Sequence, residues 1–429
     1  MKKLALLSFL FCDLCLAEGT FGISKHPKQS FAAQVDGELI YKGRTSNLVA
    51  DSLSKIDGKK LFVVRLPLFI DIKPDLEKFA KILLVEESDY ALVELTGKEQ
   101  DLAELAHNKN GACGPIVKLG NWSPLVKDDS GLSKVSKPMN SPDKKLKDVV
   151  SLISKVESTK IYNSILFMEN MGSRYHKSEQ GKLVPKSIGE KYRALIPSGR
   201  KDVEIKFVDV KRSPQDNLVV RIVGSETPDE IVVLGSHIDS IVQWGRGQQA
   251  PGADDDASGT ATNLEIFRIL MENGITPKKT IEFHGYAAEE AGLVGSADLA
   301  NQYLKLGVDV VSMVQMDMNL YSGRQNSLDT MWFVSNGTND SLTENLKEFA
   351  RSYLGVKTVS ARLTAGTSDH QSWAQRGFVA AFPFENPNEY NRKIHTKNDR
   401  AAVVGNADFS ALYAKLGLAY LGHYAGFVN

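Results

Sequence analysis

The stretch IVVLGSHID at residues 231–239 narrows the fold more than any other part of the sequence. Its first four residues are apolar and predict a buried β-strand that ends at Gly235. His237 and Asp239 follow directly. In open α/β sheets, ligands bind just beyond the carboxyl ends of the strands. Both side chains are therefore candidates for a functional site.

Strand-like and helix-like segments alternate around this stretch, from about residue 147 to the C-terminus. Such alternation predicts an α/β domain with a mostly parallel central sheet flanked by helices. The further strands are expected at residues 279–286, 310–317, 331–335 and 379–384, and the helices at 259–272, 296–304, 342–353 and 409–424.

Carboxylates and histidines gather where these strands end. They occur in a glycine-flanked loop, after two further strands and after the last one: Asp254, Asp255, Asp256, Glu289, Glu290, Asp317 and His395. Each group alone is weak evidence for a metal site, since an acidic triplet before a helix is usually a solvated N-cap. Together they match what a pair of metal ions requires. Nitrogen and oxygen ligands without cysteine favour zinc, with cobalt or manganese as substitutes.

The residues before 147 divide into three parts. Residues 1–17 have a basic head, an apolar run too short to span a bilayer and a small-residue end, which is typical of a signal peptide. Residues 18–120 contain expected strands at 60–66 and 90–95 and a helical piece at 76–84, and predict a small α+β domain. Residues 121–146 are rich in Ser, Pro, Lys, Asp and Gly, as in an exposed linker.

Composition limits the compartment and the partners. We expect a secreted, extracellular protein, with the periplasm as the alternative location and a buried N-terminal helix as the alternative to a signal peptide. Cys12 and Cys15 would leave with the signal segment, so that Cys113 alone would remain and no internal disulfide could form. Lys plus Arg and Asp plus Glu both number 52, which argues against nucleic acid or an anionic membrane as a partner. No later segment predicts a membrane anchor.

From about Lys147 to Asn429, two thirds of the chain, the sequence resembles the secreted bacterial leucyl aminopeptidases of the two-zinc exopeptidase superfamily. The resemblance rests on separate motifs in the family's order: GSHIDS at 235–240, PGADDDASG at 251–259, YAAEE at 286–290, QMDM at 315–318, SDH at 368–370 and IHT at 394–396. It implies two Zn²⁺ ions per chain. Carried over by position, His237 and Asp317 would bind one ion, Glu290 and His395 the other, and Asp255 both.

The same resemblance gives roles to two further carboxylates. Glu289 would be the general base, which takes a proton from the attacking water and passes it to the leaving amine. Asp239 would orient His237 through the outer N–H of its ring. A cis bond between Asp255 and Asp256 is also implied. Because the site would hold a free α-amine, the implied reaction is the removal of single N-terminal residues from peptides.

Residues that match the family's side-chain pocket are all apolar or aromatic: Met318, Phe333, Phe382, Phe384, Tyr390 and Ile394. They imply a preference for large hydrophobic residues such as leucine, although each one alone could equally be a core residue. Two departures from the family lie close together. Leu363 and Thr367 stand where relatives have the pocket disulfide, and Ala365 stands where they have a tyrosine that stabilises the oxyanion.

Several expectations remain open at this stage. His284 and His370 are expected to be supporting or packing groups rather than ligands. The domain at 18–120 resembles the prosegments of exported enzymes, which predicts a zymogen, and the chain is expected to be a monomer. Two rival functions on this fold are a glutaminyl cyclase, which works with one zinc, and a non-catalytic binding ectodomain. The complete ligand set favours the peptidase.

Overall fold

The computed structural model describes the chain in two parts. It describes residues 144–242, 249–363 and 366–428, residues 138, 139 and 141, and, before these, Thr96 and seven strands. The chain divides into two compact units, Met1–Lys127 and Asp128–Asn429. The division falls inside the linker expected at residues 121–146. Each unit is described separately.

The first unit contains a seven-stranded sheet in the order β3-β2-β1-β7-β4-β6-β5. Its neighbours pair antiparallel, except β1 and β7, which are parallel. The helix expected at residues 76–84 is wrong from Ala80 onward, because β5 pairs there with β6. A short apolar run fits a helix or a strand, and pairing decides between them. The strands are β1 (Leu16–Ser24), β2 (Ser30–Val35), β3 (Glu38–Arg44), β4 (Leu61–Arg65), β5 (Ala80–Val85), β6 (Tyr90–Leu95) and β7 (Ile116–Trp122).

Several N-terminal predictions fall outside the described residues. The signal segment at 1–17 is described only from Leu16, where β1 begins, and all three cysteines lie outside the described part. The described elements of this unit are strands, so the helices of the expected α+β domain stay a prediction. In the described part of the chain, no helix is long and apolar enough to cross a membrane.

The second unit is built on a six-stranded sheet in the order β16-β13-β10-β12-β9-β8. Strands β16, β13, β10 and β12 are parallel, whereas β9 and β8 pair antiparallel at one edge. This confirms the mostly parallel sheet and adds a hairpin to the expected strands. The bounds are β8 (Val203–Val210), β9 (Ser213–Ile222), β10 (Thr227–His237), β12 (Lys279–Tyr286), β13 (Asp309–Gln315) and β16 (Ala380–Ala381).

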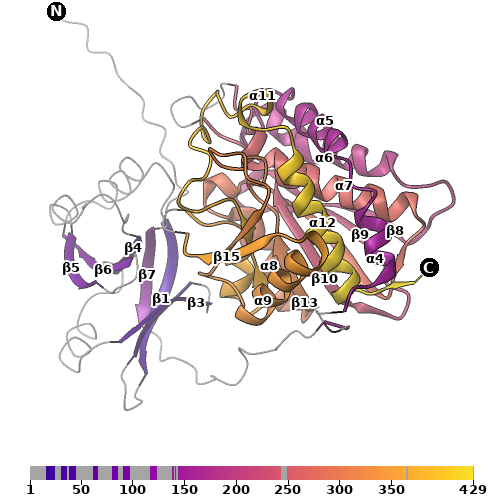
Figure 1. The fold of residues 1–429 in the computed structure, drawn as a ribbon. Helices are drawn as coiled ribbons and strands as arrows, with labels where there is room; N and C mark the ends of the chain where they lie inside the picture. Colours follow the sequence, from indigo (N-terminus) through magenta and orange to yellow (C-terminus); the bar gives the residue numbers. More distant parts are fainter. Residues whose placement is uncertain are drawn as a thin grey trace, which may run out of the picture. The chain divides into compact units, whose positions relative to one another are not determined.

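Helices cover both faces of this sheet (Figure 1). Val232 and Leu234 of β10 pack into the main core with α5, α6, α7 and α12, whereas Ile231 and Val233 pack into a second cluster with α8 and α10. Successive side chains of a strand point to opposite faces, so four apolar residues in a row need cover on both. The helices are α4 (Lys147–Ile153), α5 (Ser158–Glu169), α6 (Glu179–Ala194), α7 (Gly259–Glu272), α8 (Val294–Leu306), α9 (Asp340–Phe349), α10 (His370–Gln375), α11 (Ala401–Val404) and α12 (Asp408–Tyr424).

The strand expected at residues 379–384 is divided between two sheets. β16 pairs with β13 in the main sheet, whereas β17 pairs with β14 in a separate three-stranded sheet. Phe382 lies at the change of sheet. The remaining elements are β14 (Thr330–Val334), β15 (Lys357–Ala361), β17 (Pro383–Phe384), the pair β11 (Thr276–Pro277) and β18 (Phe427–Val428), and the turns η2 (Ala253–Ser258), η3 (Glu289–Ala291) and η4 (Ala350–Leu354).

Candidate active site

The five residues expected to bind metal lie together beyond the carboxyl ends of the parallel strands. His237 is the last residue of β10, and Asp317 follows β13. Asp255 lies in η2, at the entrance to α7. Glu290 lies in η3, shortly after β12, and His395 lies in the loop after β17. For His237, Glu290 and Asp317 this placement follows from the parallel sheet, which brings the ends of its strands to one edge.

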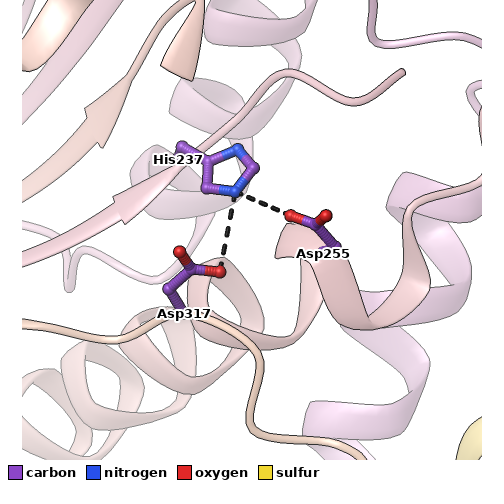
Figure 2. A group of neighbouring side chains, drawn as sticks. All are labelled: His237, Asp255 and Asp317. Carbon is purple, nitrogen blue, oxygen red and sulfur yellow. Dashed lines mark hydrogen bonds and ion pairs between the residues drawn. The ribbon is translucent and has the colours of Figure 1, made fainter. Parts of the chain in front are cut away.

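Asp255 faces two imidazoles at once, one with each carboxylate oxygen. Its Oδ1 lies 3.0 Å from Nε2 of His237, and its Oδ2 lies 3.0 Å from Nε2 of His395. The same nitrogen of His237 is 3.6 Å from Oδ1 of Asp317, and that of His395 is 2.9 Å from Oε2 of Glu290. Figure 2 shows the first group, in which the His237 ring points at both carboxylates. Two groups of one imidazole and two carboxylates therefore share Asp255.

Unpaired atoms show that these groups suit a cation. Oδ1 of Asp317 and Oε1 of Glu290 are buried and have no hydrogen-bond partner, although buried carboxylate oxygens are normally paired. Within each group, the candidate ligand atoms lie within 4.8 Å of one another. Imidazole nitrogen and carboxylate oxygen are donors that zinc commonly takes. The residues present therefore fit a zinc ion in either group.

Asp239 holds the backbone of the two adjacent glutamates. Its Oδ1 accepts from the backbone N–H of Glu289 at 2.9 Å, and its Oδ2 accepts from that of Glu290 at 3.3 Å. Oδ1 also lies 3.5 Å from Nδ1 of His237, beyond the usual hydrogen-bond range. The expected contact with the histidine is therefore long. The shorter contacts, to the glutamate backbone, were not part of the expectation.

Burial and crowded charges shift protonation throughout the site. Burial raises the pKa of Glu289 well above its usual value, and neighbouring carboxylates add to the rise while His237 opposes it. Burial, and next the charge of Asp255, raise the pKa of Glu290 to about 7. Burial alone would lower the pKa of His237, but the surrounding carboxylates, first Asp317, raise it well above its usual value. Surroundings that favour a proton on an imidazole also favour another cation beside it.

A buried acidic network supports the loop of Asp255. Asp399 accepts hydrogen bonds from the backbone N–H groups of Asp254 and Asp255, both at 3.2 Å. Asn391 donates to Oδ2 of Asp254 at 3.0 Å and to Oδ1 of Asp399 at 3.1 Å. Burial raises the pKa of Asp399 well above its usual value and that of Asp254 to about 6. Sequence reasoning missed Asp399 and Asn391, because they act from positions more than a hundred residues away along the chain.

Other polar residues near the strand ends support the candidate ligands. Ser368 donates its hydroxyl to Oδ2 of Asp317 at 2.5 Å. His284 contacts Glu282 at 2.7 Å within its own strand, and Nε2 of His370 lies 3.3 Å from a backbone carbonyl. Neither imidazole belongs to a group of candidate ligands among the described residues, in keeping with the supporting role expected for both.

An apolar cluster adjoins the site. Two of its members, Met318 and Ile394, are sequence neighbours of Asp317 and His395. Aromatic rings pack within it, with centroids 5.1 Å apart for Phe382 and Phe384. The cluster consists of Met318, Val334, Leu363, Phe382, Phe384, Tyr390 and Ile394. Five of the six expected pocket residues are therefore together.

Phe333 is the exception, since it lies outside the apolar cluster. Its side chain lies in the main core with Met331, two residues earlier on β14, whereas Val334 lies in the apolar cluster. Because neighbouring residues of a strand face opposite sides, Phe333 faces away from the apolar cluster that contains Val334. The alternation could have revealed this. Ala365, where a tyrosine was expected, lies outside the described residues.

Comparisons with known proteins agree with this geometry. The chain matches the model of peptidase family M28 over residues 217–414, a range that contains all five expected ligands. A protein of Saccharomyces cerevisiae named "Probable aminopeptidase YDR415C" is 33% identical over 270 residues, which are 60% of this chain and 71% of the yeast protein. "Leucine aminopeptidase 1" of Ajellomyces capsulatus (strain H88) is 33% identical over 289 residues, 64% of this chain and 74% of the fungal protein.

Solved structures show the same fold. LapB from Legionella pneumophila superposes with a TM-score of 0.69 at 24% identity, over 85% of this chain and 99% of its own. The LapA aminopeptidase of the same organism gives 0.67 at 24% identity, over 86% and 99%. The fold rests on these structures, and the family rests on the matched region and the identity to curated relatives. The chain therefore belongs to peptidase family M28 and is a zinc-dependent aminopeptidase.

Proposed function

We propose that the enzyme binds two zinc ions, one in each group that shares Asp255, and that Glu289 is its general base. The observation that carries the proposal is the position of Asp255, whose two oxygens each lie 3.0 Å from a different imidazole. A carboxylate placed in this way can bridge two ions. His237 and Asp317 complete one group, and Glu290 and His395 complete the other.

The protein's own groups supply the proton transfers. Zinc ions bound here would supply the positive charge that polarises a peptide carbonyl, acidifies water and attracts a free α-amine. Glu289 takes a proton from the attacking water and gives it to the leaving amine. Its pKa, raised first by burial, suits a carboxyl group that must accept and return a proton. Asp239 holds this base in place through the backbone N–H of Glu289.

The substrates are peptides with a free N-terminus and a large hydrophobic first residue such as leucine. The apolar cluster next to the candidate ligands supports this preference, since five of the six residues that match the family's pocket gather in it. Leucine, methionine and phenylalanine fill such a surface without leaving a polar group unpaired. Two fungal relatives carry the name leucine aminopeptidase, in keeping with this preference.

The biological setting follows from the N-terminal segments. Residues 1–17 are a signal peptide, the enzyme is secreted as a monomer, and residues 18–120 are a prosegment that is released by cleavage in the linker. The compact division of the chain after Lys127 supports this reading. Secreted protein that is fully active with residues 18–429 intact, as measured by mass spectrometry, would count against release of the prosegment.

Hydrolysis of leucine p-nitroanilide and its N-acetyl form tests the mechanism. The purified enzyme should contain two zinc ions per chain and cleave only the substrate with a free amine. Glu289→Ala should keep both ions and lose activity, because it removes the base and leaves the ligands. Glu190→Ala, which removes an exposed glutamate of α6 far from the site in sequence, is the matched control and should leave both quantities unchanged.

Each negative result has a distinct meaning. One zinc ion per chain, together with conversion of an N-terminal glutamine into a pyroglutamyl residue and release of ammonia, would show a cyclase. Two zinc ions without any cleavage, before and after trimming in the linker, would show a binding ectodomain. Activity retained in Glu289→Ala would assign the base to another residue.

A further inference from the structure

Arg174 is a fully buried cation that contacts the backbone of the site. It lies between α5 and α6, and its side chain has no exposed surface. Its guanidinium donates three hydrogen bonds to backbone carbonyls: Nε to Ile238 at 3.1 Å, Nη1 to Pro251 at 2.6 Å and Nη2 to Gly252 at 2.8 Å. It makes no ion pair with any described carboxylate within 4.0 Å. A buried guanidinium bound only to carbonyls is unusual, because buried charges are normally paired.

The three carbonyls belong to the two loops that carry His237 and Asp255. Ile238 directly follows His237 and precedes Asp239, whereas Pro251 and Gly252 directly precede η2, which contains Asp255. Arg174 therefore ties the end of β10 to the start of η2. Its planar fork fixes both loops in one relative position, which a flexible ammonium could not do.

The packing leaves no room for another arrangement. Gly252 has a positive φ of 50°, and a Cβ there would lie 2.8 Å from Nη2 of Arg174 and 2.4 Å from the carbonyl oxygen of Asp255. Only glycine adopts this conformation readily and lets the guanidinium approach the backbone so closely. The contact therefore depends on both residues: Gly252 has no side chain in the way, and Arg174 brings a buried guanidinium against the backbone.

We propose that Arg174 is a positioning residue that sets the zinc affinity of the group His237, Asp255 and Asp317 by fixing the loops of the first two ligands. This inference rests on the proposed metal-binding function. Of the second group only Asp255 lies in these loops; Glu290 and His395 lie on other segments, and Glu290 contacts the first loop through its backbone N–H, which donates to Asp239 at 3.3 Å. Arg174 therefore acts more strongly on the first group than on the second.

The charge of Arg174 and its contacts with the two loops predict opposite changes in zinc affinity when the side chain is removed. The guanidinium lies in the field of four carboxylates, Asp256, Asp399, Asp239 and Asp255. Removal of a nearby positive charge would by itself tighten the binding of a cation. Removal of the tether would weaken it, because outer residues that orient metal ligands typically change affinity about 10- to 100-fold. The sign of the change thus separates the two roles.

Zinc titration of the metal-free, full-length chain against a competing chelator tests the proposal, with Co²⁺ absorption as a second reporter. Arg174→Met and Arg174→Lys should both bind zinc about 10- to 100-fold more weakly than the wild type in the group of His237, Asp255 and Asp317. The change in zinc affinity should be smaller in the group of Asp255, Glu290 and His395. Lysine should fail to rescue, because it keeps the charge and loses the fork. The control is Arg268→Met, which removes another buried arginine, paired with Glu265 on α7. It should lower thermal stability and leave zinc affinity unchanged.

Three results would overturn the inference: unchanged or tighter zinc binding in Arg174→Met, full rescue by lysine, or an equal loss in Arg268→Met. Where a variant is unfolded without metal, the zinc concentration that folds it replaces the titration, since binding and folding are then coupled. Arg268→Met supplies the reference for destabilisation alone. A wild type that binds no zinc contradicts the proposed function itself, whereas normal wild-type binding with unaltered Arg174 variants contradicts only this inference.

Discussion

Asp239 connects three functional residues through one carboxylate, although it is outside both candidate ligand groups. Both of its oxygens accept backbone N–H groups, from Glu289 and Glu290, and one also approaches His237. A carboxylate can accept at every position around it, whereas an amide presents donors on one side. The orientation of the proposed base and of one candidate ligand therefore depends on the charge state and shape of this single side chain.

Asp239→Asn tests that dependence. The amide leaves at least one buried backbone N–H unpaired, which costs about 1–3 kcal/mol. We expect kcat/KM for leucine p-nitroanilide to fall about 5- to 140-fold, because each 1.4 kcal/mol corresponds to a factor of ten. Zinc content should stay at the wild-type level at saturating metal. Asp216→Asn on β9 is the control and should keep wild-type kinetics. Equal kinetics in both variants would refute the role of Asp239.

Glu282 gives a second residue-scale prediction, on stability. It is buried on β12 and is bonded to His284 at 2.7 Å and to Arg221 at 2.6 Å. Burial alone would raise its pKa above the usual value of 4.5, but His284 and Arg221 lower the pKa to about 2. Because the folded pKa lies below the unfolded one, the group stabilises the fold above pH 4.5, and this contribution disappears as the pH falls towards 2.

Thermal unfolding of wild type and Glu282→Gln between pH 7 and pH 3 measures this contribution. The difference should be no more than about 3 kcal/mol at neutral pH, since one pKa unit is 1.36 kcal/mol and Arg221 is partly exposed. It should shrink as the pH is lowered below 4.5. Protonation of the metal site affects both proteins and cancels in the difference. A difference that stays constant over this range would exclude the ionised form as the source.

Sequence motifs predict the candidate ligands of the site better than they predict the residues that hold those ligands in position. A motif marks each of four candidate ligands, which lie at strand ends, just after them or in the turn before a helix: His237, Asp255, Glu290 and Asp317. Arg174 has no such signal, because it acts through backbone carbonyls of residues 64 to 78 positions away. Any loop residue could make such contacts until the fold is known.

At the scale of elements, α7 shows how closely a helix can approach a strand end. Gly259 begins this helix with an ordinary helical φ of −67°. A Cβ at this position would lie 2.0 Å from the carbonyl oxygen of Met316 and 2.6 Å from Oδ1 of Asp256. Glycine is needed here for space rather than for backbone conformation. The close approach brings η2 beside the strand that precedes Asp317.

Gly259→Ala should therefore destabilise the protein by about 3 kcal/mol or more, because both clashing atoms belong to fixed structure. The control is Gly189→Ala in α6, where the Cβ would come closest to the end of the Phe207 ring, at 2.9 Å, and would make an ordinary contact with Ile205 at 3.6 Å. That ring is partly exposed and can move. Alanine should there be neutral or stabilise by up to about 1 kcal/mol. Chemical denaturation measures both values, and similar losses in the two variants would contradict the argument.

Elements with a clear hydrophobic pattern in the sequence match their predicted bounds. Short elements that depend on pairing with another strand do not. Strand β12 and helix α7 occupy the predicted residues 279–286 and 259–272. The segment 379–384 reads as one strand, yet its two halves pair with different partners. Likewise, β5 reads as part of a helix and is a strand, because β6 lies beside it. Tertiary pairing decides such short apolar runs.

At the scale of the whole molecule, the second unit has the features of a part that folds without the first. It has clusters of buried residues on both faces of its sheet, and the candidate ligands all lie within it. Two hydrogen bonds from residues before α4 mark where this folded unit begins. The backbone N–H of Met139 donates to the carbonyl of His423 at 2.8 Å, and that of Leu146 donates to the hydroxyl of Tyr353 at 2.7 Å. These residues belong to the folded unit, although they lie in the predicted linker.

Two fragments test this border. Residues 139–429 should unfold cooperatively and bind zinc like the full chain, because the fragment keeps the core and both contacts. Residues 147–429 should fold with a melting temperature lower by a few degrees, since two hydrogen bonds at about 1 kcal/mol each are lost. Tyr353→Phe in the longer fragment removes the hydroxyl that accepts from Leu146 and that also lies 2.9 Å from Nε2 of His423, so it should lower the melting temperature of that fragment. Equal melting temperatures for both fragments would place the border after Leu146, and loss of folding in both would show that the second unit depends on the first.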